Sequence, residues 1–211
     1  MEGVNTVEWA SEPGFYGGDE NHALSAWTST RRELTEERQA RLGKLLKDLA
    51  EAGHETPFEK SFLHFLVTTD IATHIHLIKH RIGVSVNAES ARYRALIDDK
   101  AYIPDDWPKI LQAKLQDHVE RSQKAYHDTL AELTPLLGRK RAKESSRFFL
   151  PYATQITSDA AFNFRSFIHF QRLRNSEHAQ KEVRDVAQEM LRLTRETGAF
   201  NLSLEAFGYG G

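Results

Sequence analysis

Residues 162–197 contain neither proline nor glycine, the two residues that most often interrupt an α-helix. This feature predicts one long helix from Phe162 to about Thr197. Its first half is apolar on several sides, which is typical of a buried helix; the apolar residues are Phe162, Phe164, Phe167, Ile168, Phe170 and Leu173. Its second half carries a narrower stripe made of Val183, Val186, Ala187, Met190 and Thr194.

Arginine and histidine side chains occur on more than one side of this predicted helix. Each helical residue advances by about 100°, so Arg165 and His169 share one side. Arg174 and His178 share another side, roughly 180° from Arg165. Burying arginines on opposite faces is unfavourable unless each finds an anion. Arg–Glu pairs, or stems that reach solvent, are the better explanation of any single arginine. For the whole set, the alternative is a helix that lies between subunits and contributes to two sites.

Composition excludes several classes of function. The chain has 211 residues and a formal net charge of -2, so no global basic field for nucleic acid exists and any anion site must be a local cluster. Cysteine is absent, which excludes disulfides, thiolate metal sites and a thiol nucleophile. No apolar run approaches the roughly 18 residues of a membrane span, and the acidic N-terminus is unlike a signal peptide. A soluble cytoplasmic protein is expected.

The remaining patterns predict a helix-rich α+β fold. Two predicted strands cover residues 62–69 and 154–159, and residues 1–28 and 198–211 form an irregular lead-in and a tail, with a last short strand in the tail as one option. Four helices are predicted besides the long one. The first follows Thr30 and Glu33 and stops at Gly53, and its apolar face consists of Leu42, Leu45, Leu46 and Leu49. The second covers residues 71–81 with Asp70 as N-cap, the third begins after Asp105 or Asp106 and Pro108 and is broken by Pro135 and Gly138, and the fourth is a short basic helix over 139–149. We expect a single domain over residues 1–211.

The stretch KHRIGVSVNAESARY (79–93) places Lys79, His80 and Arg81 directly after an apolar run. Cations at the C-terminal end of a helix complement its dipole, which is the ordinary explanation. The alternative is an anion site. Because the chain has no P-loop and no G-x-G-x-x-G motif, any nucleotide must be held by side chains. Arginine and hydroxyl donors suit phosphoryl oxygens.

Three weaker patterns accompany this cluster. GHETPFEK (53–60) places His54, Thr56 and Glu59 between a helix end and a strand, where loops often carry function. ESSRFFLP (144–151) places Arg147 near a helix end. His76 and His80 have a spacing that can chelate zinc. No glutamate lies beside them to act as a base, and no spacing in the sequence requires a further metal ligand, so two ordinary histidines are favoured over a metal site.

Taken in order, these segments resemble the flavin-dependent thymidylate synthases. GHETPFEK is similar to the His-x-Thr-Pro-Phe-Glu segment of that family, and KHRIGVSVNAESARY is similar to its signature of Arg-His-Arg, seven residues, then Ser-x-Arg-Tyr. The segments AYIP (101–104), SSRFFLP and NFRSFIHFQRLRNSEHAQKEVR (163–184) resemble later blocks. The resemblance covers roughly residues 50–197, and several matched blocks are far more specific than one motif.

The resemblance implies a concrete activity. Members of the family are homotetramers whose sites are assembled from more than one subunit, with a helix-rich fold around a mostly antiparallel sheet. They bind FAD, which NADPH reduces, and transfer a methylene unit from methylenetetrahydrofolate to C5 of dUMP, giving dTMP. No enzyme cysteine attacks the pyrimidine, which is compatible with a chain that lacks cysteine. No nucleic acid, membrane or metal is implied.

The resemblance also implies site residues. The positions that match cofactor contacts are His54, Thr56, Glu59, Lys79, His80, Arg81, Asn163, Arg165 and His169. The positions that match nucleotide contacts are His76, Lys79, Glu89, Ser90, Ala91, Arg92, Arg147 and Arg174. Arg174 matches the catalytic arginine that stabilises the ionised pyrimidine, an electrostatic role suited to a dry site. The Arg165 side is expected to face flavin and the Arg174 side to face the nucleotide.

Departures from the family pattern concern mainly the nucleotide side. Lys79 replaces the first arginine and so loses its planar fork. Eight residues separate Arg81 from Ser90, and Glu89 has moved by one position relative to the family's Asn-Glu-x-Ser. His76 stands where glutamine is common, and His169 where asparagine is common. Three alternatives therefore remain open: C5-methylation of UMP in a modified-nucleoside pathway, a non-catalytic flavin- or nucleotide-binding module, and a helical interaction protein.

Overall fold

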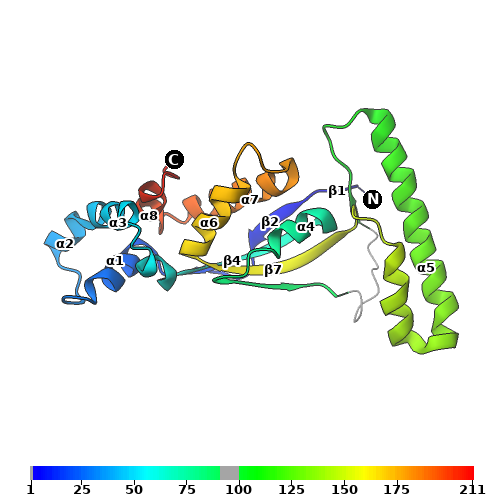
Figure 1. Ribbon diagram of the computed structural model, residues 1–211, viewed down its shortest axis with the longest axis horizontal. Helices are drawn as coiled ribbons and strands as arrows, with labels where there is room; N and C mark the ends of the chain where they lie inside the picture. The colour runs from blue at the N-terminus through cyan, green and yellow to red at the C-terminus, as the bar shows by residue number, and fades with distance from the viewer. Residues whose placement is uncertain (1, 91–99) are drawn as a thin grey trace. The chain divides into compact units, whose positions relative to one another are not determined.

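The computed structural model describes residues 2–90 and 100–211 and has an α+β fold with a central antiparallel sheet (Figure 1). The strands of this sheet are β2 (Thr6–Trp9), β3 (Phe15–Tyr16), β4 (Phe62–Asp70), β5 (Val84–Ala88) and β7 (Gln155–Asn163). Their order is β2-β4-β7-β5, and β3 pairs antiparallel with β4. A separate parallel pair joins β1 (Glu2–Gly3) to β6 (Ala101–Tyr102). The predicted helix-rich α+β fold is confirmed.

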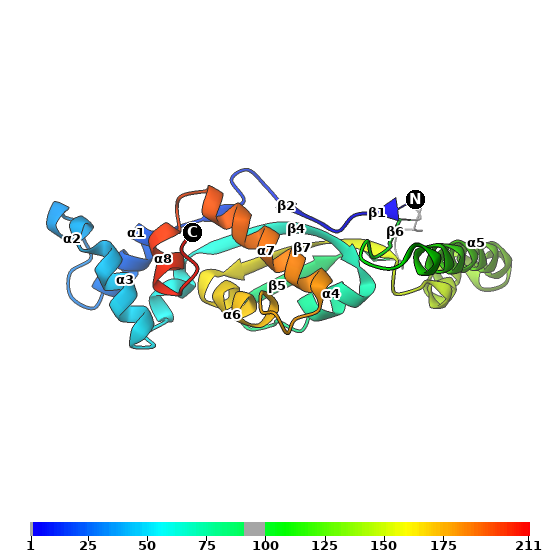
Figure 2. The ribbon, with the colours of Figure 1, turned by 90° about the horizontal axis from the view of Figure 1, so that it is seen from above.

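The helices of the described residues vary widely in length. They are α1 (Asp19–Trp27), α2 (Glu36–Ala40), α3 (Leu42–Glu51), α4 (Ile71–Leu77), α5 (Lys109–Ser146), α6 (Phe164–Arg174), α7 (Lys181–Glu196) and α8 (Asn201–Ala206), with short 3-10 helices η1 (Thr56–Lys60) and η2 (Arg147–Phe149). Helix α6 packs against α7, and α3 packs against α8 (Figure 2).

The chain forms two compact units. The α5 unit consists of the described residues of Met1–Thr6, Thr68–Leu77 and Asn87–Ser158, and it contains α4, α5 and η2. The α6 unit consists of Val7–Val67, Ile78–Val86 and Asp159–Gly211, and it contains the other helices listed above. Strands β4, β5 and β7 have residues in both units.

The core of the α6 unit is aromatic. Helix α6 contributes Phe164, Phe167 and Phe170, all with no exposed surface. Phe164 stacks on Phe200 with ring centroids 5.3 Å apart, and Phe167 stacks on Phe65 of β4 at 6.0 Å. Burying a side chain of this size stabilises the fold by roughly 1.5–3 kcal/mol. The apolar side of α6 is therefore fixed against the sheet and the C-terminal segment.

Strand β4 confirms the strand predicted over 62–69. Its buried residues alternate along the chain, as expected for a strand with one covered face: Leu63, Phe65, Val67 and Thr69. The strand ends at Asp70, whose carboxylate accepts a hydrogen bond from the Thr73 amide at 2.8 Å. Asp70 thus caps α4, as predicted.

Two stop signals read from the sequence are also confirmed. Gly53 follows α3 with a φ of 69°, a left-handed conformation that glycine adopts without steric cost. Gly138 has φ 77° and ψ 152° and breaks α5 into two helical parts, whereas Pro135 lies inside the helix. The short basic helix predicted over 139–149 corresponds to the second part of α5 and η2.

The prediction of one helix over 162–197 is wrong. Phe162 and Asn163 end β7, and the chain between Arg174 and Lys181 is not helical. Asn175 donates from its side chain to Gln171 Oε1 at 3.1 Å, and it takes the C-cap position of α6. Asparagine and serine compete for local backbone and side-chain partners, so this segment ends a helix without proline or glycine. His178 lies beyond the end of α6.

The helix predicted over 71–81 is also too long, because α4 ends at Leu77. The chain then turns toward the start of α6. Ser166 Oγ donates to the Ile82 carbonyl at 2.7 Å, and the Asn163 amide donates to the Gly83 carbonyl at 2.9 Å. These tertiary bonds hold the turn in place of further helical turns. The zinc spacing of His76 and His80 therefore does not apply, since His80 is outside the helix.

The two ends of the chain contain helices that the sequence patterns did not predict. Residues 1–28 include α1 as well as three short strands, and the tail contains α8 rather than a strand. The Thr30–Glu33 capping box is wrong as well: the side chain of Thr35 accepts from the Arg38 amide and caps α2. Helix α8 begins where the buried carboxylate of Asp19 accepts from the Leu202 and Ser203 amides at 2.9 and 2.8 Å. Because Asp19 is far from α8 in the sequence, no local sequence pattern predicts this cap.

Candidate functional site

A cavity of about 280 Å³ lies between the turn that follows α4 and one face of α6, within the α6 unit. Its lining residues are Lys79, His80, Arg81, Ile82, Val84, Ser166, His169, Leu173 and Arg174. No lining residue carries a carboxylate, whereas three are permanent cations. The cavity is therefore suited to an anionic ligand.

The turn that carries the cationic residues is fixed on the N-terminus of α6. The Asn163 side chain caps this helix by accepting from the Ser166 amide at 2.8 Å, and the backbone amide of Asn163 donates to Gly83. Gly83 has a φ of 65°. A Cβ atom at this position would lie 2.2 Å from Asn163 Nδ2 and 2.3 Å from Ser166 Oγ. Only glycine allows this close approach of the turn to the helix.

Arg174 and His80 make direct contact on one side of the cavity. Arg174 Nε donates to His80 Nε2 at 3.1 Å in a partly buried position. The His80 ring packs edge-on against Phe170, with centroids 4.9 Å apart, and lies 6.0 Å from the His169 ring. An imidazole nitrogen that accepts a hydrogen bond carries no proton, so this geometry corresponds to neutral His80 with its proton on Nδ1.

Arg165 occupies a different environment on α6. It donates from Nε to Glu55 at 2.8 Å and from Nη1 to Glu59 at 2.6 Å, which joins the 53–60 segment to this helix. The hydrogen bond to Glu59, followed by that to Glu55, raises the pKa of Arg165. Its side chain is 48% exposed, so water screens these pairs. His54 and Thr56 of the same segment are exposed.

The structure brings together part of the expected site. Five predicted residues line the cavity: Lys79, His80, Arg81, His169 and Arg174. Arg165 and Arg174 have separate surroundings, as expected for opposite sides of a helix. His169, however, lines the cavity with Arg174 although the helical spacing assigned it to the side of Arg165.

Other predicted nucleotide contacts belong to the α5 unit. His76 is on α4, and Ser90 follows β5. The Glu89 amide donates to the Thr157 carbonyl at 2.8 Å, while Glu89 Oε2 accepts from the Thr157 amide at 3.0 Å. Arg147 is exposed at the start of η2 and donates to the Glu144 carbonyl. Ala91 and Arg92 lie outside the described residues.

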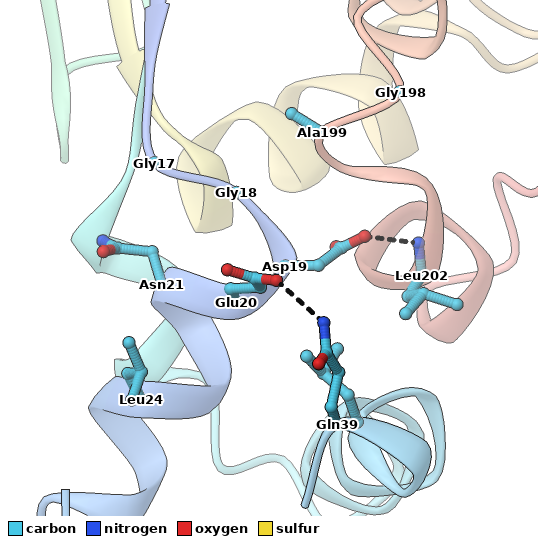
Figure 3. A pocket seen from close by; sticks show the side chains of 11 residues that line it. Gly17, Gly18, Asp19, Glu20, Asn21, Leu24, Gln39, Gly198, Ala199 and Leu202 are labelled. Atoms are coloured by element: carbon cyan, nitrogen blue, oxygen red, sulfur yellow. Dashed lines mark hydrogen bonds between the residues drawn. The ribbon is translucent and has the colours of Figure 1, made fainter. Parts of the chain in front are cut away.

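A second cavity, of about 540 Å³, lies beside the N-terminus of α1 (Figure 3). Asp19 lines it, but its carboxylate is directed at α8, where it accepts from Leu202 and from both the amide and the hydroxyl of Ser203. Gln39 of α2 donates to Glu20 across the cavity. These polar groups already bind one another, so the cavity results from the packing of α1, α2 and α8 and does not indicate a ligand site.

A buried histidine continues this network. His22 has no exposed surface and bonds Ser203 Oγ through Nδ1 at 2.8 Å and Ser61 Oγ through Nε2 at 2.6 Å. Burial lowers the pKa of His22 to about 3. Burial also raises the pKa of Asp19, against the opposite effect of its bonds from Ser203 and Leu202. The network holds α1, α8 and the start of β4 together and has no access to solvent at His22.

Sequence reasoning missed three residues that shape the site. Ser166 and Gly83 fix the cationic turn, and Glu55 shares Arg165 with Glu59. The only local signal was Asn163, three residues before Ser166, which is a typical N-cap spacing. Within the described part of the chain, no group of three or more His, Asp or Glu side chains is arranged to hold a metal ion. Nor does that part include a helix with the length and hydropathy needed to cross a bilayer.

Comparisons with known proteins identify a family. A family model described as "Thymidylate synthase complementing protein" matches residues 15–197. A flavin-dependent thymidylate synthase of Pseudothermotoga lettingae is 30% identical over 175 residues, covering 81% of this chain and 77% of that protein. Another from Mycobacterium avium is 33% identical over 159 residues; the match covers 70% of this chain and 63% of that protein, less than two thirds of its length.

Solved structures show the same fold. The UMP/dUMP methylase PolB of Streptomyces cacaoi, bound with 5-Br dUMP, superposes with a TM-score of 0.80 at 26% identity, covering 100% of this chain and 97% of that one. The same methylase bound with 5-Br UMP gives a TM-score of 0.77 at 24% identity, covering 99% and 96%, and this likeness supports the fold alone.

Proposed function

The chain belongs to the flavin-dependent thymidylate synthase family, and on this premise we propose that it is a methyltransferase that adds a methyl group to C5 of a uridylate. The expected conversion is dUMP to dTMP, with methylenetetrahydrofolate as carbon donor, FAD as cofactor and NADPH as reductant. One observation supports this most directly: Lys79, His80, Arg81, His169 and Arg174 line one cavity that contains no carboxylate.

The residues present fit a phosphate-bearing cofactor and substrate. The cavity, at about 280 Å³, is slightly smaller than the range for small-molecule sites, about 300–1,000 Å³, so it accommodates part of a dinucleotide such as its phosphates or ring edge. Lys79 and Arg81 supply charge, and Glu55 and Glu59 hold Arg165 beside the 53–60 segment. When bound and reduced by NADPH, FAD would supply the hydride that turns the transferred methylene carbon into a methyl group.

Arg174 has the central role in this proposal. Its guanidinium is permanently charged and partly buried, so it stabilises negative charge on a pyrimidine ring more strongly than an exposed arginine does. Charge on the ring increases the electron density at C5, the atom that attacks the one-carbon unit. No cysteine is available to activate C5 by covalent attack, so this electrostatic activation is the route that the chain offers.

The choice between dUMP and UMP depends on the departures in the nucleotide segment. The PolB methylase, whose described substrates are UMP and dUMP, makes UMP the second candidate. A ribose 2′-OH requires space and a hydrogen-bond partner, and a site rejects a ligand that leaves its polar groups unpaired. A competition assay with equal dUMP and UMP, read by mass spectrometry of the methylated products, decides between the two substrates.

A homotetramer with shared sites, a single catalytic domain over residues 1–211 and a cytoplasmic location complete the proposal. Arg147 is exposed in the α5 unit, next to Phe148, which is 81% exposed, and Phe149, which is 50% exposed. Exposed aromatic residues beside an arginine are typical of interfaces. Light scattering of the purified protein measures the assembly state.

The first test is flavin binding followed by turnover. The purified protein is titrated with FAD, and methylated product is measured with either nucleotide in the presence of methylenetetrahydrofolate and NADPH. Arg174→Ala is expected to lower turnover by about 100- to 1,000-fold while FAD binding persists. If the protein does not bind FAD, the proposed enzymatic function is rejected. If it binds FAD but methylates neither nucleotide, the result supports a non-catalytic flavin- or nucleotide-binding module.

A further inference from the structure

We propose that His80 is a positioning residue that orients the Arg174 guanidinium, and that it does so only in its neutral form. This inference rests on the proposed function, because Arg174 is the residue on which the C5-methylation depends. The observation that carries it is the hydrogen bond from Arg174 Nε to His80 Nε2 at 3.1 Å.

The contact uses the one nitrogen of Arg174 that leaves the rest of its fork available. A guanidinium has five N–H donors in a plane, and a bond through Nε fixes that plane while the two terminal nitrogens keep their donors for a ligand. Within the described residues, the bond from Nε to His80 is the side-chain hydrogen bond that the structure shows for Arg174. The orientation of the plane decides whether the terminal nitrogens meet the oxygen and nitrogen atoms of a flat pyrimidine edge.

His80 is itself held firmly enough to act as a support. Its ring lies edge-on to Phe170, at 4.9 Å and an interplanar angle of 71°, and Phe170 is completely buried. The His169 ring, on the same helix, lies 6.0 Å away. The turn that carries His80 is bonded to α6 through Ile82 and Gly83. Arg174 and His80 therefore make contact between two firmly held elements, α6 and the turn bonded to it.

The charges around His80 make its protonation state decisive. Lys79 and Arg81 flank it along the chain, and His169 and Arg174 approach it from α6. Glu55 and Glu59 form ion pairs with Arg165 and Arg172 of the same helix. Protonation removes the lone pair that accepts the Arg174 bond and places two cations in contact, so the guanidinium is expected to turn away.

Two substitutions separate this role from a general structural one. His80→Gln keeps a carbonyl oxygen that accepts from Arg174 but does not titrate, and His80→Leu keeps bulk without an acceptor. Because FAD contacts are also expected at His80, rates are measured at saturating FAD, and FAD affinity is measured separately. We expect His80→Leu to lower kcat about 10- to 100-fold, the range for a lost hydrogen bond to a charged group. His80→Gln is expected to retain more of the rate.

The pH profile and a double-mutant cycle provide the decisive readouts. The wild-type kcat is expected to fall on the acid side, whereas His80→Gln loses this dependence. In an Arg174→Ala background, His80→Leu is expected to change the residual rate less than threefold, because the residue acts through Arg174. Equal losses in both backgrounds, or an acid-side fall in kcat that persists in His80→Gln, would overturn the proposal.

A measurement without turnover separates this inference from the proposed function. Nitrogen-15 NMR of histidine-labelled protein reports which ring nitrogen of His80 carries the proton. The Nδ1–H form is expected in the wild type, and Arg174→Ala is expected to relax this preference. An Nε2–H form at neutral pH contradicts the inference even if the enzyme is active. If His80 carries its proton on Nδ1 but the protein does not methylate uridylate, the Arg174–His80 contact is supported and only its role in catalysis is rejected.

Discussion

Asn163 and Gly83 meet backbone to backbone, with the Asn163 amide donating to the Gly83 carbonyl at 2.9 Å, while the Asn163 side chain caps α6. One residue therefore starts the helix that carries His169 and Arg174 and also holds the turn that carries Lys79, His80 and Arg81. The geometry of the cavity depends on this junction.

Gly83→Ala is expected to destabilise the protein and displace the cationic turn. The new Cβ would meet Asn163 Nδ2 at 2.2 Å and Ser166 Oγ at 2.3 Å, and the φ of 65° adds strain. We expect a loss of about 1–2 kcal/mol from the backbone and about 1–3 kcal/mol more from crowding. Urea denaturation measures the sum.

Gly53→Ala is the matched control for this substitution. Gly53 has a similar φ of 69°, but an added Cβ would find nothing within 4 Å. It therefore reports the backbone strain alone. Equal losses for the two variants would show that the turn does not press against α6.

Arg174→Ala is expected to lower the rate of methylation by about 100- to 1,000-fold with little change in the free energy of unfolding. The factor is the typical loss when one stabilising donor is removed from a catalytic site. Steady-state kinetics measures it. Arg192→Ala is the control: Arg192 lies on the exposed face of α7 and pairs with Glu189 and Glu196. A comparable loss in that variant would mean that the effect is not local.

The stability of the protein is expected to decrease below pH 6.5 because of His22. Its pKa is about 3 in the folded chain and about 6.5 when unfolded, so between these values the unfolded chain binds more protons. The stabilisation from neutral His22 is complete above pH 6.5 and falls by up to about 1.4 kcal/mol per pH unit on acidification. Urea denaturation at pH 7 and pH 5 measures the change.

Variants isolate this contribution from that of Asp19. Burial raises the pKa of Asp19, so just above pH 3.8 the folded chain binds more protons at this residue, and Asp19 alone makes stability increase on acidification there. His22→Gln removes the histidine proton and is expected to flatten the pH dependence between pH 7 and 5. His178→Gln, at an exposed site, is expected to leave it unchanged. A His22→Gln slope equal to that of the wild type would contradict the assignment.

The Arg165–Glu59 pair is expected to contribute little to stability. The bond is short, at 2.6 Å, but the side chains are 48% and 30% exposed. Exposed pairs of this kind contribute about 0.2–1 kcal/mol, and salt weakens them. A double-mutant cycle of Arg165→Ala and Glu59→Ala at low and high salt measures the coupling. A coupling above 2 kcal/mol that persists at high salt would indicate a desolvated pair instead.

The sequence by itself determined the features whose causes are local or carried by several motifs. The aromatic and β-branched run over 62–69 predicted β4, Asp70 predicted the start of α4, and Gly53 and Gly138 marked turns that need a positive φ. The ordered motifs indicated the family, and they selected five of the residues that line the cavity.

Only the tertiary structure decided the features that depend on distant partners. The turn at Ile82 and Gly83 ends α4 early because α6 supplies the hydrogen bonds, and α8 begins where Asp19 supplies its cap. The hydrogen bond between His80 and Arg174 joins residues far apart in sequence, so no spacing along the chain encodes it. Hydrogen bonds of this kind depend on how the apolar side of α6 packs, because packing determines which polar groups lie within reach of each other.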